Sequence, residues 1–285
     1  MIVDIHTHYV DFEGEFGQQL RDDLTCCGIS HDVWRYNEAT YLEGTKAADK
    51  VIVFGLKAAK TGWNVDNRRV ADFALRYAEK YIYFVSIDPS EPDCLDELKI
   101  NHLSMGCKGV KIGPIYQGVH PLDDRFYRIY DYCEKNRLPI MTHMATTFSS
   151  GVPLDYARPV HMDQVACDFP DLKIVLAHLG HPWEGETLAI IRRQENVYAD
   201  LSALYYRPWQ FYNAMQLAVE YNCCNKVLFG SDFPATSTQD SLDGLRRLNQ
   251  IAIKSHLPVI PEAIIDGIIH RNSLEALNID ISKLS

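Results

Sequence analysis

The 285-residue sequence lacks several features that mark particular classes of protein. It has no cluster of Lys and Arg, and its 28 basic against 38 acidic side chains give a formal charge of −10. That balance repels phosphate backbones and anionic membranes. No apolar run approaches the roughly 18 residues that a membrane span requires, and no basic and apolar leader follows Met1. We therefore expect a cytoplasmic protein that binds neither nucleic acid nor membrane.

Cysteine is also sparse. The eight cysteines are too dilute for a disulfide scaffold, and none forms a C-x-x-C pair typical of a zinc or redox site. With 47% hydrophobic and 23% charged residues, the chain has the composition of a globular protein that buries a sizeable core. No Ser-, Gly- or Pro-rich linker divides it, so we expect one domain over residues 1–285 that acts on a small molecule.

Eight short β-rich runs alternate with helical segments. The runs are Ile2–His6, Val51–Leu56, Ile82–Ile87, Gly109–Ile112, Leu138–His143, Leu172–His178, Val197–Leu201 and Val227–Gly230. Most of them start roughly 25 to 35 residues apart, the length of one βα repeat. Apolar stripes at helical spacing lie at Asn67–Tyr81, Asp123–Lys135, Val160–Asp168, Trp209–Tyr221 and Leu242–Ser255, and Ile260–Leu277 is expected to form terminal helices.

This alternation fits either a closed barrel or a doubly wound open sheet. No Gly-rich phosphate-binding fingerprint follows the first run, where a nucleotide-binding open sheet would have one. Candidate catalytic residues follow several different runs, from the first to the last, and only a closed barrel brings these ends around one opening. We therefore predict an α/β fold, a single (β/α)₈ barrel of the TIM type with extra C-terminal helices.

An Asp-Ile-His-Thr-His motif covers residues 4–8, at the end of the first run and just beyond it. Because side chains alternate along a strand, Asp4, His6 and His8 are expected on one face, with Val3 and Ile5 turned toward the helices. Two imidazoles at this spacing can bind one metal ion, and Asp4 could fix a histidine tautomer behind them. Two histidines also fall at this spacing by chance in a chain with 11 of them.

Other strand ends carry the same kinds of side chain. His143 and His178 end the fifth and sixth runs, and Asp232 follows the eighth. A lone histidine at a strand end is more often a polar cap than a ligand, but two of them after the first-strand pair favour a metal site. The alternative for Asp232, a helix N-cap, is weakened because Phe233 and Pro234 intervene before the next helical pattern.

The fourth run places a lysine toward the opening of the predicted barrel. Val110 and Ile112 are expected to face the helices, so Lys111 points inward. We rank three roles for Lys111. The first is a positive charge that contacts a substrate carboxylate or the metal ligands, the second is a carboxylated lysine that bridges two metals, and the third is a side chain that reaches solvent.

Together these motifs resemble the amidohydrolase superfamily, in particular its amidohydrolase-2 branch of aminocarboxymuconate semialdehyde decarboxylase-like metal enzymes. The matching segments are Asp-Ile-His-Thr-His at 4–8, Gly-Val-Lys-Ile-Gly-Pro at 109–114, Thr-His at 142–143, Ala-His-Leu-Gly-His-Pro-Trp at 177–183 and Phe-Gly-Ser-Asp-Phe-Pro at 229–234. The resemblance implies a distorted (β/α)₈ barrel with a divalent metal, zinc as the first expectation and manganese as the second, held by His6, His8, His143 and Asp232.

The resemblance also implies a role for His178, which is a catalytic histidine beside a single metal or a ligand of a second metal if Lys111 is carboxylated. In a hydrolase, Asp232 would accept the proton of a metal-activated water while His178 polarises the carbonyl under attack. The alternative is a non-oxidative decarboxylase of an aromatic or unsaturated carboxylic acid, and the third reading is a metal-binding barrel without activity. The metal motifs do not separate the first two.

Loop residues near the expected opening are candidates for contact with the substrate. They are His181 and Trp183 after the sixth run, Tyr116 after the fourth and Arg158 after the fifth, together with Lys111. A tryptophan such as Trp183 can stack on a planar substrate, although a packed loop aromatic is at least as common, and most loop arginines are merely solvated. A homodimer is the commonest assembly for such a chain.

Overall fold

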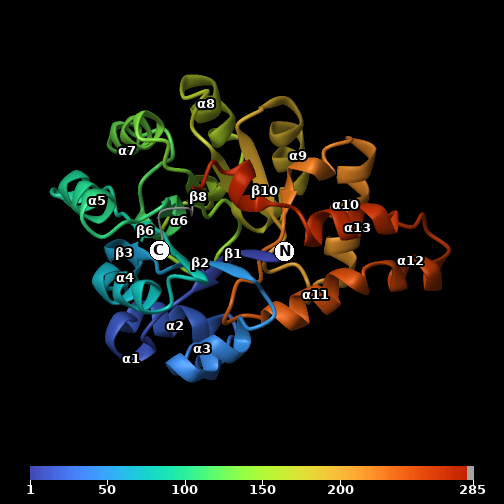
Figure 1. Ribbon diagram of the computed structural model, residues 1–285, viewed down its shortest axis with the longest axis horizontal. Coiled ribbons are helices and arrows are strands. Elements are labelled where there is room, and N and C mark those ends of the chain that lie inside the picture. The colour runs from blue at the N-terminus through green and yellow to red at the C-terminus, as the bar shows by residue number, and fades with distance from the viewer. Residues whose placement is uncertain (281–285) are drawn as a thin grey trace.

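The computed structural model describes residues 1–280 and shows a ring of parallel strands surrounded by helices (Figure 1). The ring consists of β1 (Val3–His8), β2 (Lys50–Phe54), β5 (Tyr81–Tyr83), β6 (Val85–Ser86), β7 (Val110–Ile112), β8 (Ile140–Thr142), β9 (Ile174–Leu176), β10 (Val197–Asp200) and β11 (Val227–Leu228). A short antiparallel pair, β3 (Lys57–Ala58) and β4 (Trp63–Asn64), lies in the loop after β2.

Hydrogen bonds join the two parallel sheets into one ring. The strands β5 and β6 occupy one strand position interrupted at Phe84, with β5 paired to β2 and β6 paired to β7. On the other side, the Ile5 amide donates to the Phe229 carbonyl at 3.1 Å and the Asp232 amide donates to the His6 carbonyl at 2.8 Å. The predicted (β/α)₈ barrel is therefore confirmed, with its eight strand positions in chain order.

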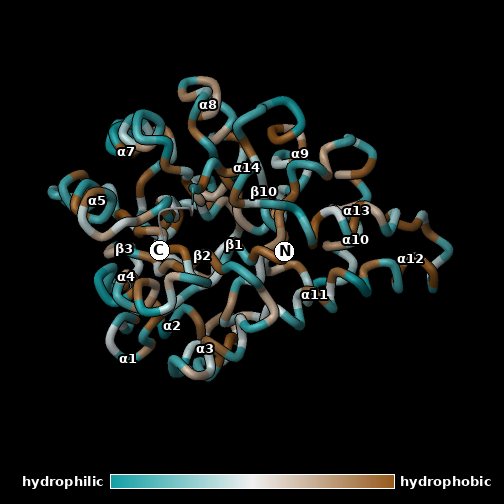
Figure 2. The backbone as a smooth tube through the Cα atoms, in the orientation of Figure 1, coloured by the Kyte–Doolittle hydropathy of each residue, from teal (hydrophilic) through white to brown (hydrophobic). Residues whose placement is uncertain are grey.

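Helices cover the outside of the ring, and each buries one side. In Figure 2 the outer helices alternate between hydrophilic and hydrophobic stretches, as this arrangement requires. Within residues 1–280, no helix is long and apolar enough to cross a membrane. The helices are α1 (Phe12–Glu15), α2 (Gln18–Cys26), α3 (Glu38–Gly44), α4 (Asn67–Arg76), α5 (Cys94–Leu103), α6 (Pro114–Gln117), α7 (Asp124–Lys135), α8 (His161–Asp168), α9 (Glu184–Arg193), α10 (Pro208–Glu220), α11 (Thr238–Arg246), α12 (Asn249–Ser255), α13 (Glu262–Ile269) and α14 (Ser273–Ala276).

The helix predictions differ from the structure mainly at their ends. The segment predicted as one helix at Leu242–Ser255 is two helices, α11 and α12, and α12 extends away from the barrel (Figure 1). The predicted helix at Asn67–Tyr81 ends at Arg76, because Tyr81 already belongs to β5. The long first connection, which carried no prediction, holds the helices α1 to α3.

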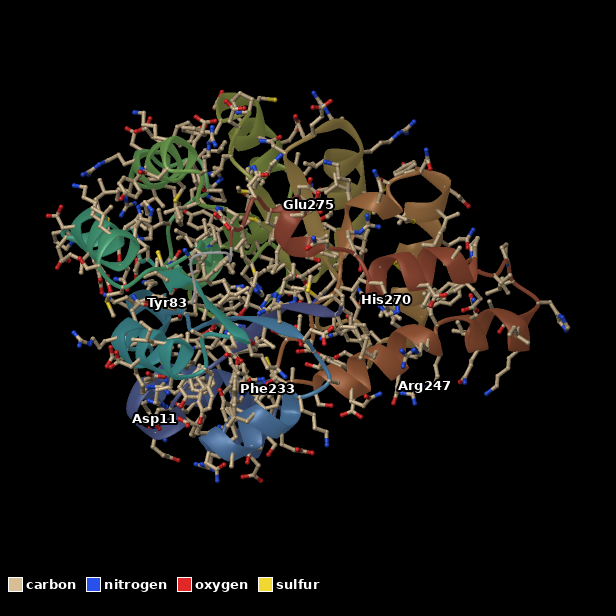
Figure 3. All side chains as sticks on the ribbon, in the orientation of Figure 1. Asp11, Tyr83, Phe233, Arg247, His270 and Glu275 are labelled. Atoms are coloured by element: carbon tan, nitrogen blue, oxygen red, sulfur yellow. The ribbon has the colours of Figure 1, made fainter. Side chains whose placement is uncertain are left out.

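Apolar side chains fill the barrel interior and α14 closes its N-terminal end. The interior cluster contains Val3, Ile5, Ile52, Phe54, Ile82, Phe84, Met141, Val175 and Leu228, with Leu274, Leu277 and Ile279 packed beneath them. Glu275 marks α14 where it lies across the strands in Figure 3. The closed end leaves only the C-terminal ends of the strands for a site.

A bulge in β1 corrects the predicted direction of its side chains. Asp4 pairs with Val51 and Thr7 with Val53, so three steps on β1 match two on β2. Val3 and Ile5 lie in the barrel interior, whereas Asp4 contacts Ser231 and Thr238 outside the ring, and the bulge is what brings His6 and His8 to the interior side. The prediction that Asp4 shares a face with the two histidines, and that Val3 and Ile5 face the helices, is therefore wrong.

Candidate metal centre

Three ligand atoms converge where β1 ends and the chain leaves β11. The Nε2 of His6 lies 3.3 Å from the Nε2 of His8 and 3.3 Å from the Oδ1 of Asp232, and the third side of this triangle measures 3.4 Å. Ligands held about 2.0–2.1 Å from a tetrahedral ion are about 3.4 Å apart. Asp232 adopts φ +65°, a left-handed conformation that residues other than glycine seldom adopt. The backbone is thus strained where it presents this carboxylate.

Two further histidines join the cluster from β8 and β9. The Nε2 of His178 lies 3.1 Å from the Nδ1 of His143. His178 also offers an atom within 4.8 Å of ligand atoms of both His6 and Asp232. The backbone of His178 is left-handed, like that of Asp232, with φ +60° just after β9 ends. The structure thus brings together the predicted metal residues from the first, fifth, sixth and eighth strand positions, and the ring centres of His178 and His6 lie 4.8 Å apart.

The partners of these two rings show which nitrogens carry hydrogen. The Nε2 of His143 lies 3.2 Å from the carbonyl oxygen of Thr146, which can only accept, so the hydrogen is on Nε2 and Nδ1 is bare. The Nδ1 of His178 faces the Ser202 hydroxyl at 2.7 Å and the Ser202 carbonyl at 3.3 Å, so its hydrogen is on Nδ1. Two bare nitrogens therefore face each other, an arrangement that a cation relieves.

The His6 ring also carries its hydrogen on Nδ1, as the His178 ring does. Its Nδ1 lies 2.8 Å from the Asp200 carboxylate and therefore carries the hydrogen, which leaves Nε2 bare among the ligand atoms. Within residues 1–280, the buried Nδ1 of His8 has no hydrogen-bond partner. Burial lowers the pKa of His6 well below its ordinary value, with the charge of Lys111 acting in the same direction, and it lowers the pKa of His143 to about 3. Neutral imidazoles with bare nitrogens beside a carboxylate fit a divalent metal such as zinc.

The role predicted for Asp4 as a partner of a metal-binding histidine is not what the structure shows. Its carboxylate accepts hydrogen bonds from the Ser231 amide at 2.9 Å and the Thr238 hydroxyl at 2.6 Å, outside the barrel. Burial raises the pKa of Asp4 to about 6. Asp200, which the sequence analysis did not single out, contacts the His6 ring instead. Its only sequence signal is a carboxylate at the end of the seventh strand.

Lys111 points into the barrel, as its position in β7 predicted. The side chain is 1% exposed, its Nζ lies 3.3 Å from the Nε2 of His6, and it sits 4.7 Å from the centre of the Phe54 ring. It therefore does not reach solvent. Burial lowers the pKa of Lys111 and raises that of Asp232, while the attraction between the two charges opposes both shifts.

An aromatic wall, formed by Trp34, Trp63, Tyr116 and Phe148, stands beside the histidines. Trp63 lies 5.7 Å from the His8 ring and 5.5 Å from Tyr116, as measured between ring centres. Tyr116, a predicted substrate residue, contacts His143 at 4.9 Å and Phe148 at 5.9 Å. The indole N–H groups of Trp34 and Trp63 are buried and have no hydrogen-bond partner in the described part of the chain. The two tryptophans lie in the first and second βα loops, and sequence reasoning missed them.

The remaining predicted substrate residues differ in where they lie. His181 is buried, with its ring 6.0 Å from that of His178. Trp183 precedes α9 and is partly buried against the apolar core between the strands and the surrounding helices. Arg158 pairs with Glu186 of α9, and none of its contacts within residues 1–280 involves a histidine of the metal cluster. The structure therefore brings His181 to the cluster and leaves Trp183 and Arg158 as predictions.

A second group of histidines lies on the surface. His120, Asp155 and His161 place one ligand atom each within 4.8 Å of one another. The Leu122 amide donates to the Nδ1 of His120 at 3.1 Å, so the hydrogen of that ring is on the Nε2 that faces Asp155. The Nε2 of His161 likewise faces Asp155 at 3.2 Å. This set is a hydrogen-bonded cluster and does not fit a metal.

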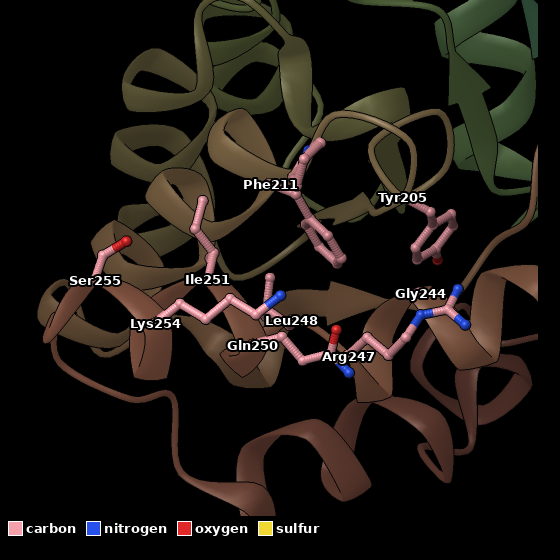
Figure 4. Close-up of a pocket in the computed structure, with 10 residues that line it drawn as sticks. Tyr205, Phe211, Gly244, Arg247, Leu248, Gln250, Ile251, Lys254 and Ser255 are labelled. Carbon is pink, nitrogen blue, oxygen red and sulfur yellow. The ribbon is translucent and has the colours of Figure 1, made fainter.

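A surface pocket of about 390 Å³ lies between α10, α11 and α12 (Figure 4). It has apolar and aromatic walls, with Arg247 and Lys254 at its edge, and it contains none of the metal-cluster residues. Its connection to the site is Tyr205, whose hydroxyl donates to the Gly230 carbonyl at 2.8 Å just after β11. The candidate metal cluster therefore lies outside this pocket, at the C-terminal ends of the strands.

Solved structures share this fold over nearly their whole length. One is an uncharacterized TIM-barrel protein from Bordetella bronchiseptica, with a TM-score of 0.75, 21% identity, and coverage of 97% of this chain and 98% of that one. Another is 5-carboxyvanillate decarboxylase from Sphingomonas paucimobilis, with a TM-score of 0.69, 14% identity, and coverage of 98% and 99%. A third is a probable 2-pyrone-4,6-dicarboxylic acid hydrolase from Acinetobacter baumannii with citric acid bound, with a TM-score of 0.65, 14% identity, and coverage of 98% and 99%.

No curated protein matches the sequence. The sequence model of the amidohydrolase family, in its type 2 form, matches residues 3–279, which is nearly the entire chain. The chain therefore belongs to the amidohydrolase family of metal-dependent enzymes.

Proposed function

We propose that this protein is a metal-dependent hydrolase of a small planar substrate that carries a carboxylate. The observation that carries the proposal is the convergence of bare imidazole nitrogens with the Asp232 carboxylate, at 3.3–3.4 Å along the His6, His8 and Asp232 triangle. Zinc suits imidazole and carboxylate donors. A divalent ion held there supplies a Lewis acid and a water molecule of lowered pKa.

The protein's own residues divide the remaining work. Asp232, whose pKa burial raises, takes a proton on its carboxylate and returns it to the leaving group. The bare Nε2 of a neutral His178 accepts a proton but cannot itself donate a hydrogen bond, so the predicted polarisation of a carbonyl by this nitrogen requires its prior protonation. Lys111 supplies positive charge for a substrate carboxylate, and the aromatic wall excludes water and stacks on a planar ring.

The second candidate is a non-oxidative decarboxylase of an aromatic or unsaturated acid. The aromatic wall supports it, because rings beside the candidate metal ligands suit an aromatic substrate, although the same rings also suit a planar lactone. The fold is shared with a named decarboxylase and with a named hydrolase of a dicarboxylic acid, so the fold does not choose between them.

The test is turnover of a panel of planar lactones and aromatic acids by zinc-loaded and manganese-loaded protein in ¹⁸O-labelled water. Hydrolysis places one label in the product, whereas decarboxylation releases CO₂ and leaves the organic product unlabelled. The Asp232→Asn variant serves as the control for background reaction. Label in the product supports the first proposal, CO₂ release replaces it with the second, and a protein that retains no metal after supplemented purification overturns both.

A further inference from the structure

We propose that Asp200 and Ser202 are positioning residues that fix the tautomer and orientation of two site histidines at once, His6 directly and His178 through the serine. Asp200 is the last residue of β10 and Ser202 lies two residues beyond it, at a strand position for which the sequence predicted no site residue. The proposal rests on the proposed function only in taking these histidines as the metal-site residues.

Asp200 is the centre of the arrangement. It is fully buried, and its Oδ2 lies 2.8 Å from the Nδ1 of His6. Its Oδ1 accepts from the amides of His178 and Ser202, each at 3.0 Å, and from the Ser202 hydroxyl. A carboxylate accepts and does not donate, so every one of these partners must bring the hydrogen. The His6 ring is thereby held with its hydrogen on Nδ1.

Ser202 carries the same constraint to the second histidine. Its hydroxyl has a single hydrogen, which is given to Asp200 because the carboxylate has none to offer. The Ser202 oxygen therefore accepts from the Nδ1 of His178 at 2.7 Å. The hydrogen of His178 is fixed on Nδ1, and Nε2 is left bare toward His143.

The backbone contacts of Asp200 hold the turn in which His178 lies. The His178 amide donates to the Oδ1 of Asp200 while the residue adopts φ +60°. Ala203, directly after Ser202, is also left-handed at φ +62°. Such conformations persist only where the surroundings determine them. The Asp200 carboxylate thus orients the His6 ring by a direct contact. It orients the His178 ring through the His178 backbone amide and through the Ser202 hydroxyl.

Carboxylates behind metal-binding histidines commonly change metal affinity or activity by about 10- to 100-fold when they are replaced. Asn at position 200 keeps one acceptor oxygen and puts an amide hydrogen where a donor already points. We expect Asp200→Asn to weaken zinc binding by about 10- to 100-fold, measured on metal-free protein by competition with a chromophoric chelator.

The direct readout is the tautomer of each ring, from ¹⁵N chemical shifts of histidine-labelled, metal-free protein. Both His6 and His178 are expected in the Nδ1–H form. Ser202→Ala removes the nearer acceptor of the His178 Nδ1 and leaves only the backbone carbonyl at 3.3 Å, so His178 should become a mixture of tautomers while Asp200 keeps His6 in the Nδ1–H form. Ser202→Thr keeps the hydroxyl and should restore His178, and Asp200→Asn should change both rings. The serine variants keep the test decisive if Asp200→Asn does not fold.

Asp88→Asn is the matched control. Asp88 is also a fully buried carboxylate at the same end of the barrel, after β6, but it accepts from the Ala59 and Ser90 amides, each at 2.9 Å. Its replacement should cost stability without moving either tautomer. Wild-type tautomers and zinc affinity in Asp200→Asn and Ser202→Ala would overturn the inference. Because no substrate is used, an inactive enzyme with the expected tautomers would overturn the proposed function alone.

Discussion

The Nδ1 of His143 lies 3.1 Å from the Nε2 of His178, and each is the bare nitrogen of its ring. Two lone pairs this close repel each other, and burial prevents water from separating them. The partners that fix the hydrogens are a carbonyl on one side and a serine held by a carboxylate on the other, so neither ring can turn its hydrogen inward without losing a bond. A cation placed between these two nitrogens relieves the repulsion.

The first prediction concerns metal content. Replacing His6 and His8 together by Ala should remove the bound metal and the activity, because it deletes two corners of the ligand triangle. The barrel should still fold, since its apolar interior lies below both residues. Elemental analysis should find about one divalent ion per wild-type chain, or about two if Lys111 bridges. Unfolding of the variant, seen by circular dichroism, would instead indicate a structural metal.

The second prediction concerns the aromatic wall. Trp63→Leu should raise KM about 3- to 10-fold for any substrate that the panel identifies, since a stacked aromatic contact contributes about 0.5–1.5 kcal/mol. Trp63→Phe keeps a ring and should stay near the wild-type KM. Steady-state kinetics and thermal unfolding are measured on both variants. A fall in Tm without any change in KM would show that the wall serves packing alone.

The sequence predicted most of the residues that converge in the candidate metal cluster, because they follow strand ends. In a barrel all strand ends meet at one opening, so His143, His178 and Asp232 converge however far apart they lie in the chain. The same parity argument placed Lys111 inside, because β7 is regular and Val110 and Ile112 face outward.

The misses have definite physical causes. The alternation rule failed at Asp4 because it assumes an unbroken pairing register, and the bulge that breaks it depends on contacts with β2. The sequence did not single out Asp200, because its role depends on contacts with His6, which lies on β1, and with Ser202, which lies beyond the end of β10. Trp34 and Trp63 sit in loops whose course no periodicity describes.

The third prediction concerns acid stability. Burial lowers the pKa of His181 to about 4, with the nearby charge of Arg207 contributing, against 6.5 in the unfolded chain. Between these values the unfolded state binds more protons, so the free energy of unfolding falls as the pH drops from 6.5 to 4 and is unaffected by this group above 6.5. His181→Asn should reduce that fall by up to about 3 kcal/mol.

Urea unfolding of metal-free protein at several pH values measures this difference without interference from metal loss. His270→Asn, which changes an exposed histidine at the end of α13, is the control and should follow the wild-type pH dependence. A His181→Asn variant with the wild-type pH dependence would show that His181 does not contribute to acid lability.

The last prediction concerns the closed end of the barrel. Leu274 of α14 is 3% exposed and packs against the interior cluster that includes Val3 and Ile5. Leu274→Ala should lower the free energy of unfolding by about 2–5 kcal/mol, because the cavity opens inside a packed core. Leu75→Ala on α4, at a side chain that is 76% exposed, should change it by less than about 0.5 kcal/mol. Equal effects of the two substitutions in urea unfolding would mean that α14 only covers the strands, whereas a large loss at Leu274 alone shows that α14 completes the core on which the metal centre stands.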